Sequence, residues 1–161
     1  MIKMIFAHGD NGEFGKGDSL PWDSPEDLQN FKEYTRGCTL VMGGATFKSL
    51  PCKLPGRKHI VLGRPGATAR NGDEPDATLP AKDSEHAIQA LSGDVCVIGG
   101  TGLLYTWAEL VDAASVTHVH GEFPEADVFI DEDSIRGELR RRFSNITVSE
   151  FPGITITNYG S

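Results

Sequence analysis

The feature that most constrains the fold is a series of short apolar runs that alternate with segments of helical pattern. The runs predict strands at residues 2–7, 39–42, 58–62, 95–98 and 115–120. Helices are predicted at residues 25–35, 45–50, 83–91 and 103–109. Short apolar strands with helices between them are typical of a mainly parallel sheet that is covered on both faces.

The end of the chain predicts an antiparallel hairpin. Alternating apolar residues over 146–151 fit one strand, a Pro152–Gly153 turn follows, and residues 154–158 resume the pattern. Residues 64–82 are rich in Gly, Pro, Asn and Asp, which predicts a surface loop with at most a short strand. With no internal repeat, residues 1–161 are expected to form a single α/β domain of about eight strands and about four helices.

Composition excludes several classes of partner. The chain has 161 residues, 39% of them apolar and 24% charged, which is ordinary for a globular domain. Its net charge of −8 argues against nucleic acid or an anionic membrane as the main partner. No run of 18 apolar residues and no signal peptide is evident, so no membrane association is expected. The basic run Arg140–Arg142 is predicted to lie on a solvated face.

Cysteines and histidines indicate a reducing compartment and no metal centre. The three cysteines are an odd number without a C-x-x-C pair, which favours a cytoplasmic protein. Cys96 lies in the apolar run VCVIGG and is predicted to be inert core. His118 and His120 share a face of one predicted strand, but no third ligand is near in sequence. A structural or surface role is therefore expected for the histidines.

Two predicted strand-to-helix junctions carry glycine. Gly43 and Gly44 lie in LVMGGATF, and Gly99, Gly100 and Gly102 lie in VCVIGGTGLLY. Glycine permits close approach of the backbone to a ligand, and a following helix N-terminus offers free N–H groups to a phosphate. Neither junction is a G-x-G-x-x-G fingerprint or a P-loop. Together, at the carboxyl ends of strands, they indicate a phosphate or dinucleotide ligand.

The stretch LPWDSPEDLQNFKEYT opens as a helix start. Ser24 fits the N-cap and Pro25 the first helical position, and Asp27, three residues after Ser24, completes a pattern like a capping box. Leu28 and Phe31 then begin an apolar stripe. Local signals leave two interpretations of Asp27 open, an ordinary acid in the first helical turn or a carboxylate aimed into a pocket beside that stripe.

The motifs in their order resemble the dihydrofolate reductase family over nearly the full length. The matching stretches are GEFGKGDSLPW at 12–22, Asp27 with Leu28 and Phe31, VMGGATFKSL at 41–50, LPGRKHIVL at 54–62, VIGG at 97–100, VTHV at 116–119 and ADVFID at 126–131. The resemblance implies hydride transfer from NADPH to C6 of 7,8-dihydrofolate with protonation at N5, which supplies tetrahydrofolate for thymidylate and one-carbon metabolism. It also implies a monomer that binds antifolate inhibitors.

The resemblance assigns catalytic roles to three residues. Asp27 falls on the pterin-binding carboxylate, where it would accept hydrogen bonds from the 2-amino group and N3. Its apolar neighbours are expected to raise its pKa, and a water held by the site is expected to carry the proton to N5. Thr117 matches a threonine that bonds this aspartate, and Trp22 would fix a water near the pterin.

The resemblance also implies residues that bind the rest of the substrate. Arg57 matches the arginine that receives the α-carboxylate of the substrate's glutamate, for which a guanidinium fork is suited. The alternative for Arg57 is a surface ion pair. The expected apolar walls for the pterin and the aminobenzoyl ring are Leu28, Phe31, Leu50 and Leu54. Ile5, Phe6 and Ala7 are expected to end the first strand at the pterin. Plain core packing is the alternative for the leucines and Phe31.

A larger set would contact the cofactor. Residues 12–20 resemble the mobile loop that closes over the nicotinamide, in which Gly12, Gly15 and Gly17 suit a lid. A cis peptide is implied between Gly99 and Gly100. The cofactor-binding residues implied are Ala7, Phe14, Gly15, Leu20, Gly43, Gly44, Ala45, Thr46, Leu62, Gly63, Arg64, Ile98, Gly99, Gly100, Thr101, Gly102, Leu103 and Leu104.

The chain departs from the family pattern at two cofactor positions. Gly44 stands where relatives often have an arginine, so Arg64 is the first candidate to read the 2′-phosphate, with Lys48 and Arg36 behind it. Leu104 stands at the position of a tyrosine, unless a one-residue insertion brings Tyr105 there.

Two other functions remain alternatives on sequence alone. One is a pyrimidine reductase of riboflavin synthesis, which shares this fold and NADPH but which Asp27, Phe31 and Arg57 disfavour. The other is a folate- or nucleotide-binding module without catalytic activity, which the two departures at the cofactor positions favour.

Overall fold

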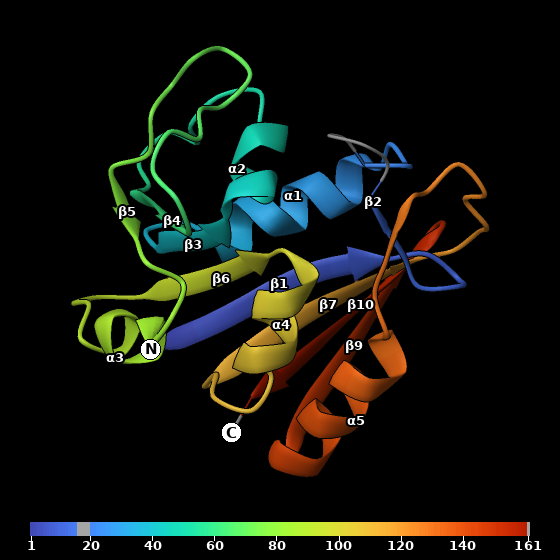
Figure 1. Ribbon diagram of the computed structural model, residues 1–161. Helices are drawn as coiled ribbons and strands as arrows, with labels where there is room; N and C mark the ends of the chain where they lie inside the picture. Colours follow the sequence, from blue (N-terminus) through green and yellow to red (C-terminus); the bar gives the residue numbers. More distant parts are fainter. Residues whose placement is uncertain (16–19, 161) are drawn as a thin grey trace.

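The computed structural model describes residues 1–15 and 20–160. Within this part of the chain, eight strands form one central sheet (Figure 1). The strand order is β5-β4-β3-β6-β1-β7-β10-β9. The strands β5, β4, β3, β6, β1 and β7 pair in parallel with their neighbours in this order, whereas β10 is antiparallel to both β7 and β9. This confirms the mainly parallel sheet with a C-terminal antiparallel hairpin.

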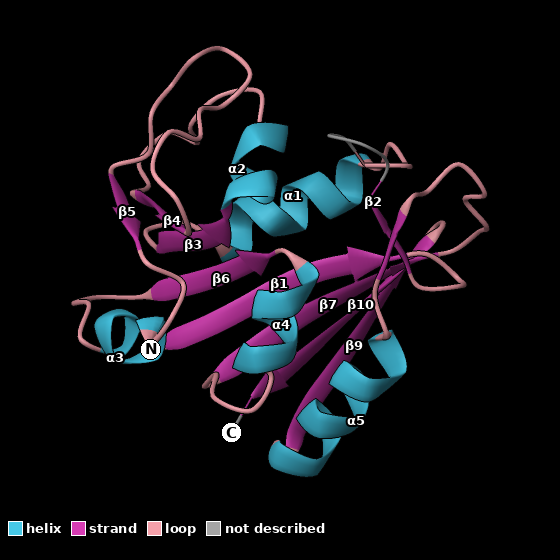
Figure 2. Cartoon of the chain, viewed as in Figure 1, coloured by secondary structure: helices cyan, strands magenta, loops and turns pink. Residues whose placement is uncertain are grey.

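Every predicted strand is present within two residues of its expected bounds. The strands of the main sheet are β1 (Ile2–His8), β3 (Thr39–Gly43), β4 (His59–Leu62), β5 (Ala77–Leu79), β6 (Val95–Gly99), β7 (Ala113–Val119), β9 (Asn145–Phe151) and β10 (Ile154–Gly160). The short strand β5 lies within the predicted loop at 64–82, most of which is irregular (Figure 2).

Helices cover both faces of the sheet. They are α1 (Pro25–Tyr34), α2 (Gly44–Ser49), α3 (Ser84–Gln89), α4 (Thr101–Trp107) and α5 (Glu132–Arg142). Helices α1 and α2 lie on one face, and α3, α4 and α5 lie on the other (Figure 1). No helix of the described residues is long and apolar enough to cross a membrane.

The core explains why the central strands carry apolar residues at most successive positions. In β1, Met4 packs with the side chains of α4 and α5, whereas Ile5 packs on the opposite face with Phe47 of α2. In β6, Val97 packs on the face covered by α4 and α5, whereas Cys96 packs on the opposite face. Successive strand residues point to opposite faces, so a sheet buried on both faces favours apolar residues at successive positions. Cys96 is fully buried, as predicted.

Helix α5 was not predicted, and the described residues contain five helices instead of about four. Its sequence, EDSIRGELRRR, is dominated by charged residues and carries Gly137 in its middle. Only Ile135 and Leu139 are buried, one helical turn apart. Two apolar residues are too few for a recognisable periodic pattern. The packing of this narrow stripe against the sheet therefore stabilises the helix more than local sequence does.

The prediction that Arg140–Arg142 lies on a solvated face is wrong for one of the three. Arg140 and Arg141 are exposed, and Arg141 pairs with Glu138 one turn away. Arg142 instead donates from its two terminal nitrogens to the carbonyl oxygens of Ala108 and Val111, each at 2.8 Å. These carbonyls follow the C-terminal end of α4, where backbone acceptors have no helical partner.

A second, two-stranded sheet was also not predicted from the sequence. Strand β2 (Glu13–Gly15) pairs with β8 (Val128–Phe129). Glu13 is buried, and its carboxylate accepts hydrogen bonds from the backbone N–H groups of Asn11 and Phe123, both at 2.6 Å. The first part of the expected lid, residues 12–15, is therefore tied to the segment after β7. Residues 16–19 of that expected lid, Gly17 among them, lie outside the described residues.

Candidate active site

The two glycine junctions lie side by side at the carboxyl edge of the sheet. Met42 of β3 is the register partner of Gly99 of β6, and a Cβ placed on Gly43 would lie 3.8 Å from the backbone nitrogen of Gly100. The peptide bond between Gly99 and Gly100 is cis, as the family resemblance implied. The two predicted ligand-facing turns thus meet on neighbouring parallel strands, the place where open α/β sheets bind ligands.

Both junctions leave backbone N–H groups available. Gly43 and Gly100 are the N-caps of α2 and α4, and neither helix start has a side-chain cap. Thr46 lies against the second junction, since its hydroxyl oxygen would be 3.4 Å from a Cβ placed on Gly99, whose φ is +135°. The first N–H groups of a helix have no partner within the helix, so these backbones can donate to phosphate oxygens.

The basic candidates for the cofactor phosphate differ in their partners. Arg64 is exposed two residues beyond β4 and makes no hydrogen bond or ion pair within the described part of the chain. Lys48 is exposed in the last turn of α2. Arg36 is paired with Glu33 at 3.1 Å. Gly44 offers no side chain for the phosphate. The backbone there has room for one, because the nearest atom to a Cβ placed on Gly44 is the Cβ of Ala67 at 4.0 Å.

The structure separates Leu104 from Tyr105. Leu104 is fully buried on the side of α4 that faces the core, and it supplies no hydroxyl in place of the expected tyrosine. Tyr105 is 41% exposed, and its hydroxyl accepts a hydrogen bond from the backbone N–H of Asp131 at 2.7 Å. The Tyr105 hydroxyl therefore serves the start of α5, away from the glycine junctions.

Asp27 has separate backbone and side-chain roles. Its backbone N–H donates to the hydroxyl oxygen of Ser24 at 3.2 Å, so Ser24 is the N-cap of α1. Its carboxylate accepts a hydrogen bond from Nε1 of Trp22, also at 3.2 Å. Burial raises the pKa of Asp27, and the hydrogen bond from Trp22 and the nearby hydroxyl of Thr117 offset this rise only in part. The side chain is thus a largely desolvated carboxylate and is not the helix cap.

Thr117 approaches this carboxylate from β7. It is buried, and it pairs with Ala7 of β1 on one side and with Ile156 of β10 on the other. Its hydroxyl is close enough to lower the pKa of Asp27, yet it makes no hydrogen bond of ordinary geometry within the described residues. A buried hydroxyl in this position retains hydrogen-bonding capacity for a ligand.

A hydrogen bond that was not predicted from the sequence joins α1 to β7. Asn30 lies one helical turn after Asp27 on α1, and its amide donates to the hydroxyl of Ser115 at 3.2 Å. Ser115 precedes Thr117 by two residues on β7, so both lie on the same face of that strand. The bridge therefore sets the position of Asp27 relative to Thr117. The spacing of three residues on the helix and two on the strand was its only sequence signal.

Apolar side chains beside Asp27 are incompletely buried. Leu28 is 54% exposed, and Phe31, Leu50 and Leu54 are partly buried against the core on the α1 face. Ile5 is buried on this face, whereas the side chain of Phe6 lies in the core of the opposite face. Phe6 can therefore contribute only its backbone at this edge. The open apolar surface of Leu28 fits a ligand wall better than plain core.

Arg57 is held beside this surface. Its guanidinium donates to the hydroxyl of Thr35 at 3.1 Å, to Pro55 O at 2.6 Å and to Lys32 O at 2.8 Å. It has no carboxylate partner among the described residues, which disfavours the surface ion pair. A guanidinium has five N–H donors, so two remain after these three bonds. Two parallel N–H groups are the arrangement that binds a carboxylate.

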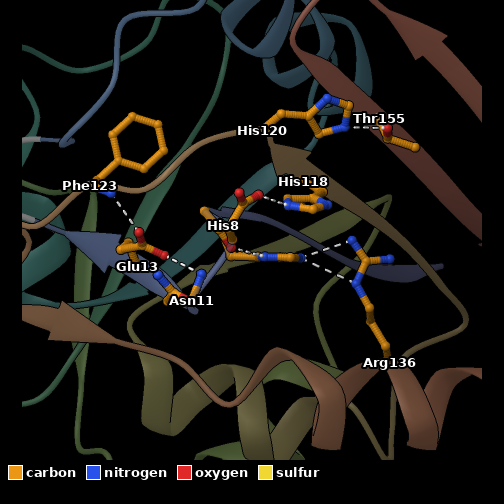
Figure 3. Close-up of polar contacts among 10 residues, drawn as sticks. His8, Asn11, Glu13, His118, His120, Phe123, Arg136 and Thr155 are labelled. Carbon is orange, nitrogen blue, oxygen red and sulfur yellow. Dashed lines mark hydrogen bonds and ion pairs between the residues drawn. The ribbon is translucent and has the colours of Figure 1, made fainter.

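Three histidines at the carboxyl ends of β1 and β7, His8, His118 and His120, have protein partners (Figure 3). Nε2 of His118 lies 2.6 Å from a carboxylate oxygen of Asp10, and Nε2 of His120 lies 2.7 Å from the hydroxyl of Thr155. His8 accepts hydrogen bonds from the guanidinium of Arg136 and stacks on His118 with ring centroids 5.0 Å apart. These contacts give each ring a structural role.

Comparison with known proteins identifies the relatives of this chain. The model of the family described as dihydrofolate reductase matches residues 1–146. The dihydrofolate reductase of Mycobacterium tuberculosis is 40% identical over 111 residues, which are 67% of this chain and 64% of that protein. The chain thus spans slightly less than two thirds of this relative's length. The Bacillus subtilis enzyme of the same name is 34% identical over 125 residues, 76% of this chain and 71% of that protein.

A solved structure extends the similarity to the fold. Dihydrofolate reductase from Enterococcus faecalis, complexed with NADP(H) and RAB-propyl, superposes with a TM-score of 0.74 at 26% sequence identity. The superposition covers 99% of this chain and 95% of that one. The eight-stranded sheet and the helices on its two faces are therefore shared with that structure.

Proposed function

The chain belongs to the dihydrofolate reductase family, and we propose that it reduces 7,8-dihydrofolate to 5,6,7,8-tetrahydrofolate with NADPH. The observation that carries this proposal is the carboxylate of Asp27. It is largely desolvated, bonds Trp22 while Ser24 caps the helix, and lies near Thr117 beside an open apolar surface.

Asp27 binds the pterin ring in this proposal. Its oxygens accept hydrogen bonds from the 2-amino group and N3, both of which are donors that a carboxylate can satisfy together. The single indole N–H of Trp22 is already engaged with Asp27, so Trp22 orients this carboxylate. A carboxylate with a raised pKa favours a protonated pterin, and N5 receives its proton from a water admitted to the site.

The cofactor site fits the residues at the two glycine junctions. When bound, NADPH supplies the hydride that reduces C6. The uncapped N–H groups of α2 and α4 donate to its phosphates, and the glycines let the backbone approach. Arg64 is exposed and has no protein partner in the described structure, so its guanidinium is available for the 2′-phosphate.

The tail of the substrate fits the α1 face. Leu28, Phe31, Leu50 and Leu54 provide apolar contact for the aminobenzoyl ring. The two remaining N–H groups of Arg57 bind the α-carboxylate of the glutamate. We further infer that the protein works as a cytoplasmic monomer and is inhibited by antifolates that occupy the pterin site. Its three free cysteines are in keeping with a reducing compartment.

The test is turnover by purified, metal-free protein. NADPH and 7,8-dihydrofolate are mixed, and the loss of nicotinamide absorbance is followed together with the appearance of tetrahydrofolate. Binding of both ligands without product would refute the enzyme and favour a binding module. Turnover of a riboflavin-pathway pyrimidine, with none of dihydrofolate, would favour the pyrimidine reductase.

A further inference from the structure

His59 is a buried histidine at the start of β4 that the proposed mechanism does not use. Its side chain has no solvent exposure, and its ring packs edge-on against Phe47 of α2 with centroids 6.0 Å apart. His59 lies two residues after the segment LPGR (54–57), in which Pro55 and Gly56 occupy the centre of a turn. The φ of Gly56 is +73°, as the third position of a type II turn requires.

The two ring nitrogens of His59 reach the two ends of this turn. The backbone N–H of Leu54, its first residue, donates to Nε2 at 3.1 Å. The carbonyl oxygen of Arg57, its last residue, lies 3.2 Å from Nδ1. A backbone N–H can only donate, so Nε2 carries no proton and Nδ1–H donates to Arg57. Burial lowers the pKa of His59, in keeping with this neutral tautomer.

The base of the turn is braced on its other side as well. The backbone N–H of His59 donates to Asp76 at 2.7 Å, and the same carboxylate pairs with Lys53 at 2.8 Å. The turn itself presents two residues of the proposed substrate site. Leu54 lies on the apolar surface, and the guanidinium of Arg57 is fixed by three hydrogen bonds of which one goes to Pro55 O within the turn.

We propose that His59 is the positioning residue that sets substrate specificity for the glutamate tail, because its ring fixes the turn that carries Leu54 and Arg57. The inference rests on the proposed function, since it concerns how that substrate is held. Each ring nitrogen holds one of these two residues. The Nδ1 bond holds the backbone of Arg57 and thereby its guanidinium, whereas the Nε2 bond holds Leu54.

Two amide variants separate the two bonds. The amide of asparagine replaces Nδ1, so His59→Asn keeps a donor for Arg57 O and loses the acceptor for the N–H of Leu54. The longer side chain of His59→Gln keeps the acceptor and loses the donor. Each variant is assayed for kcat/KM with 7,8-dihydrofolate and with 7,8-dihydropteroate, which lacks the glutamate. The control is His86→Gln, at an exposed histidine on α3.

The two variants should give different patterns. His59→Gln should lower kcat/KM for dihydrofolate about tenfold through KM, with little change for dihydropteroate, because the partly buried carbonyl of Arg57 loses its donor and Arg57 shifts. His59→Asn should lower kcat/KM for both substrates by the same factor, because Leu54 contacts the aminobenzoyl ring that they share. His86→Gln should match the wild type on both. The ratio of the two substrates comes from one preparation, so partial loss of folded protein cancels.

An unchanged substrate ratio in His59→Gln, or the same change of ratio in both variants, would overturn the inference and leave His59 with a packing role only. Wild-type protein with equal kcat/KM for dihydrofolate and dihydropteroate would also overturn it, since Arg57 would then not read the glutamate. Wild-type protein that turns over neither substrate would refute the proposed function and the inference with it.

Discussion

Replacement of Asp27 by asparagine separates the two roles that this position could have. Ser24 provides the helix cap through its hydroxyl, and the Asp27 carboxylate bonds Trp22 instead. Asp27→Asn therefore leaves the start of α1 intact, and only the charge of the site is lost. Ser24→Ala does the opposite. Glu26→Gln is the matched control, because it removes an exposed acid from the same first turn.

The size of the effect follows from the bonds that change. An asparagine presents one oxygen and one amino group, so one of the two pterin donors loses its acceptor. A hydrogen bond to a charged group contributes about 1.5–3 kcal/mol, or roughly one to two powers of ten. Loss of the charge that favours protonation at N5 adds to this, since positioned acid–base groups contribute about 10²–10⁴-fold. The hydride step should slow at least about a hundredfold at neutral pH, with NADPH affinity nearly unchanged.

The stability of the same variant should move the other way. The raised pKa of Asp27 means that the folded state binds this proton more tightly than the unfolded state does. That contribution is full below the unfolded pKa and is lost as pH rises through the folded pKa. Asp27→Asn removes this loss, so the variant should be at least as stable as the wild type at neutral pH. Ser24→Ala should cost about 1 kcal/mol.

The assay is single-turnover loss of NADPH with dihydrofolate between acidic and neutral pH, beside denaturant unfolding of all variants. The deficit of Asp27→Asn should shrink at acidic pH, where more substrate is already protonated. Nearly full activity of Asp27→Asn would refute the catalytic assignment. A loss of equal size in Glu26→Gln would show that the charge of the first helical turn, and not this carboxylate, matters.

Three further predictions concern single residues. Arg64→Ala should weaken NADPH binding by about one to two powers of ten and leave NADH binding nearly unchanged, because a charged hydrogen bond to the 2′-phosphate is lost; equal losses for both cofactors in a fluorescence titration would place that contact elsewhere. Burial lowers the pKa of His8 from 6.5 to about 4, so the folded state should lose on the order of 3 kcal/mol of stability as pH falls through that range, and His8→Asn should flatten this part of an unfolding-free-energy profile. Arg142→Met should cost about 2–3 kcal/mol in denaturant unfolding because two backbone carbonyls lose a charged donor, whereas Arg141→Met at an exposed, solvent-screened ion pair should leave stability nearly unchanged; equal costs would contradict the assigned contacts.

The regular pattern of the strands made most of the fold predictable. Runs such as VCVIGG are apolar at every position, and only burial on both faces of a parallel sheet requires that. Helix α1 was predictable to within one residue, because Ser24 and Pro25 are strong local start signals. Helix α5 was not, because Ile135 and Leu139 form too short a stripe for local sequence to reveal. The pairing of β2 with β8 likewise joins segments more than a hundred residues apart.

The sequence by itself determined the chemistry available to this protein, through the residue types in its motifs and their order along the chain. It placed glycines after two strands and an acid at the start of a helix, since these are local features. The tertiary structure alone decided their roles. Whether Asp27 caps its helix or faces Thr117 depends on how α1 packs against β7. Whether a tyrosine hydroxyl reaches the glycine junctions depends on the rotation of α4, which buries Leu104 and turns Tyr105 toward α5. The grip of His59 on Leu54 and Arg57 arises only when the turn folds back on β4, because hydrogen bonds depend on positions in space that spacing along the chain does not specify.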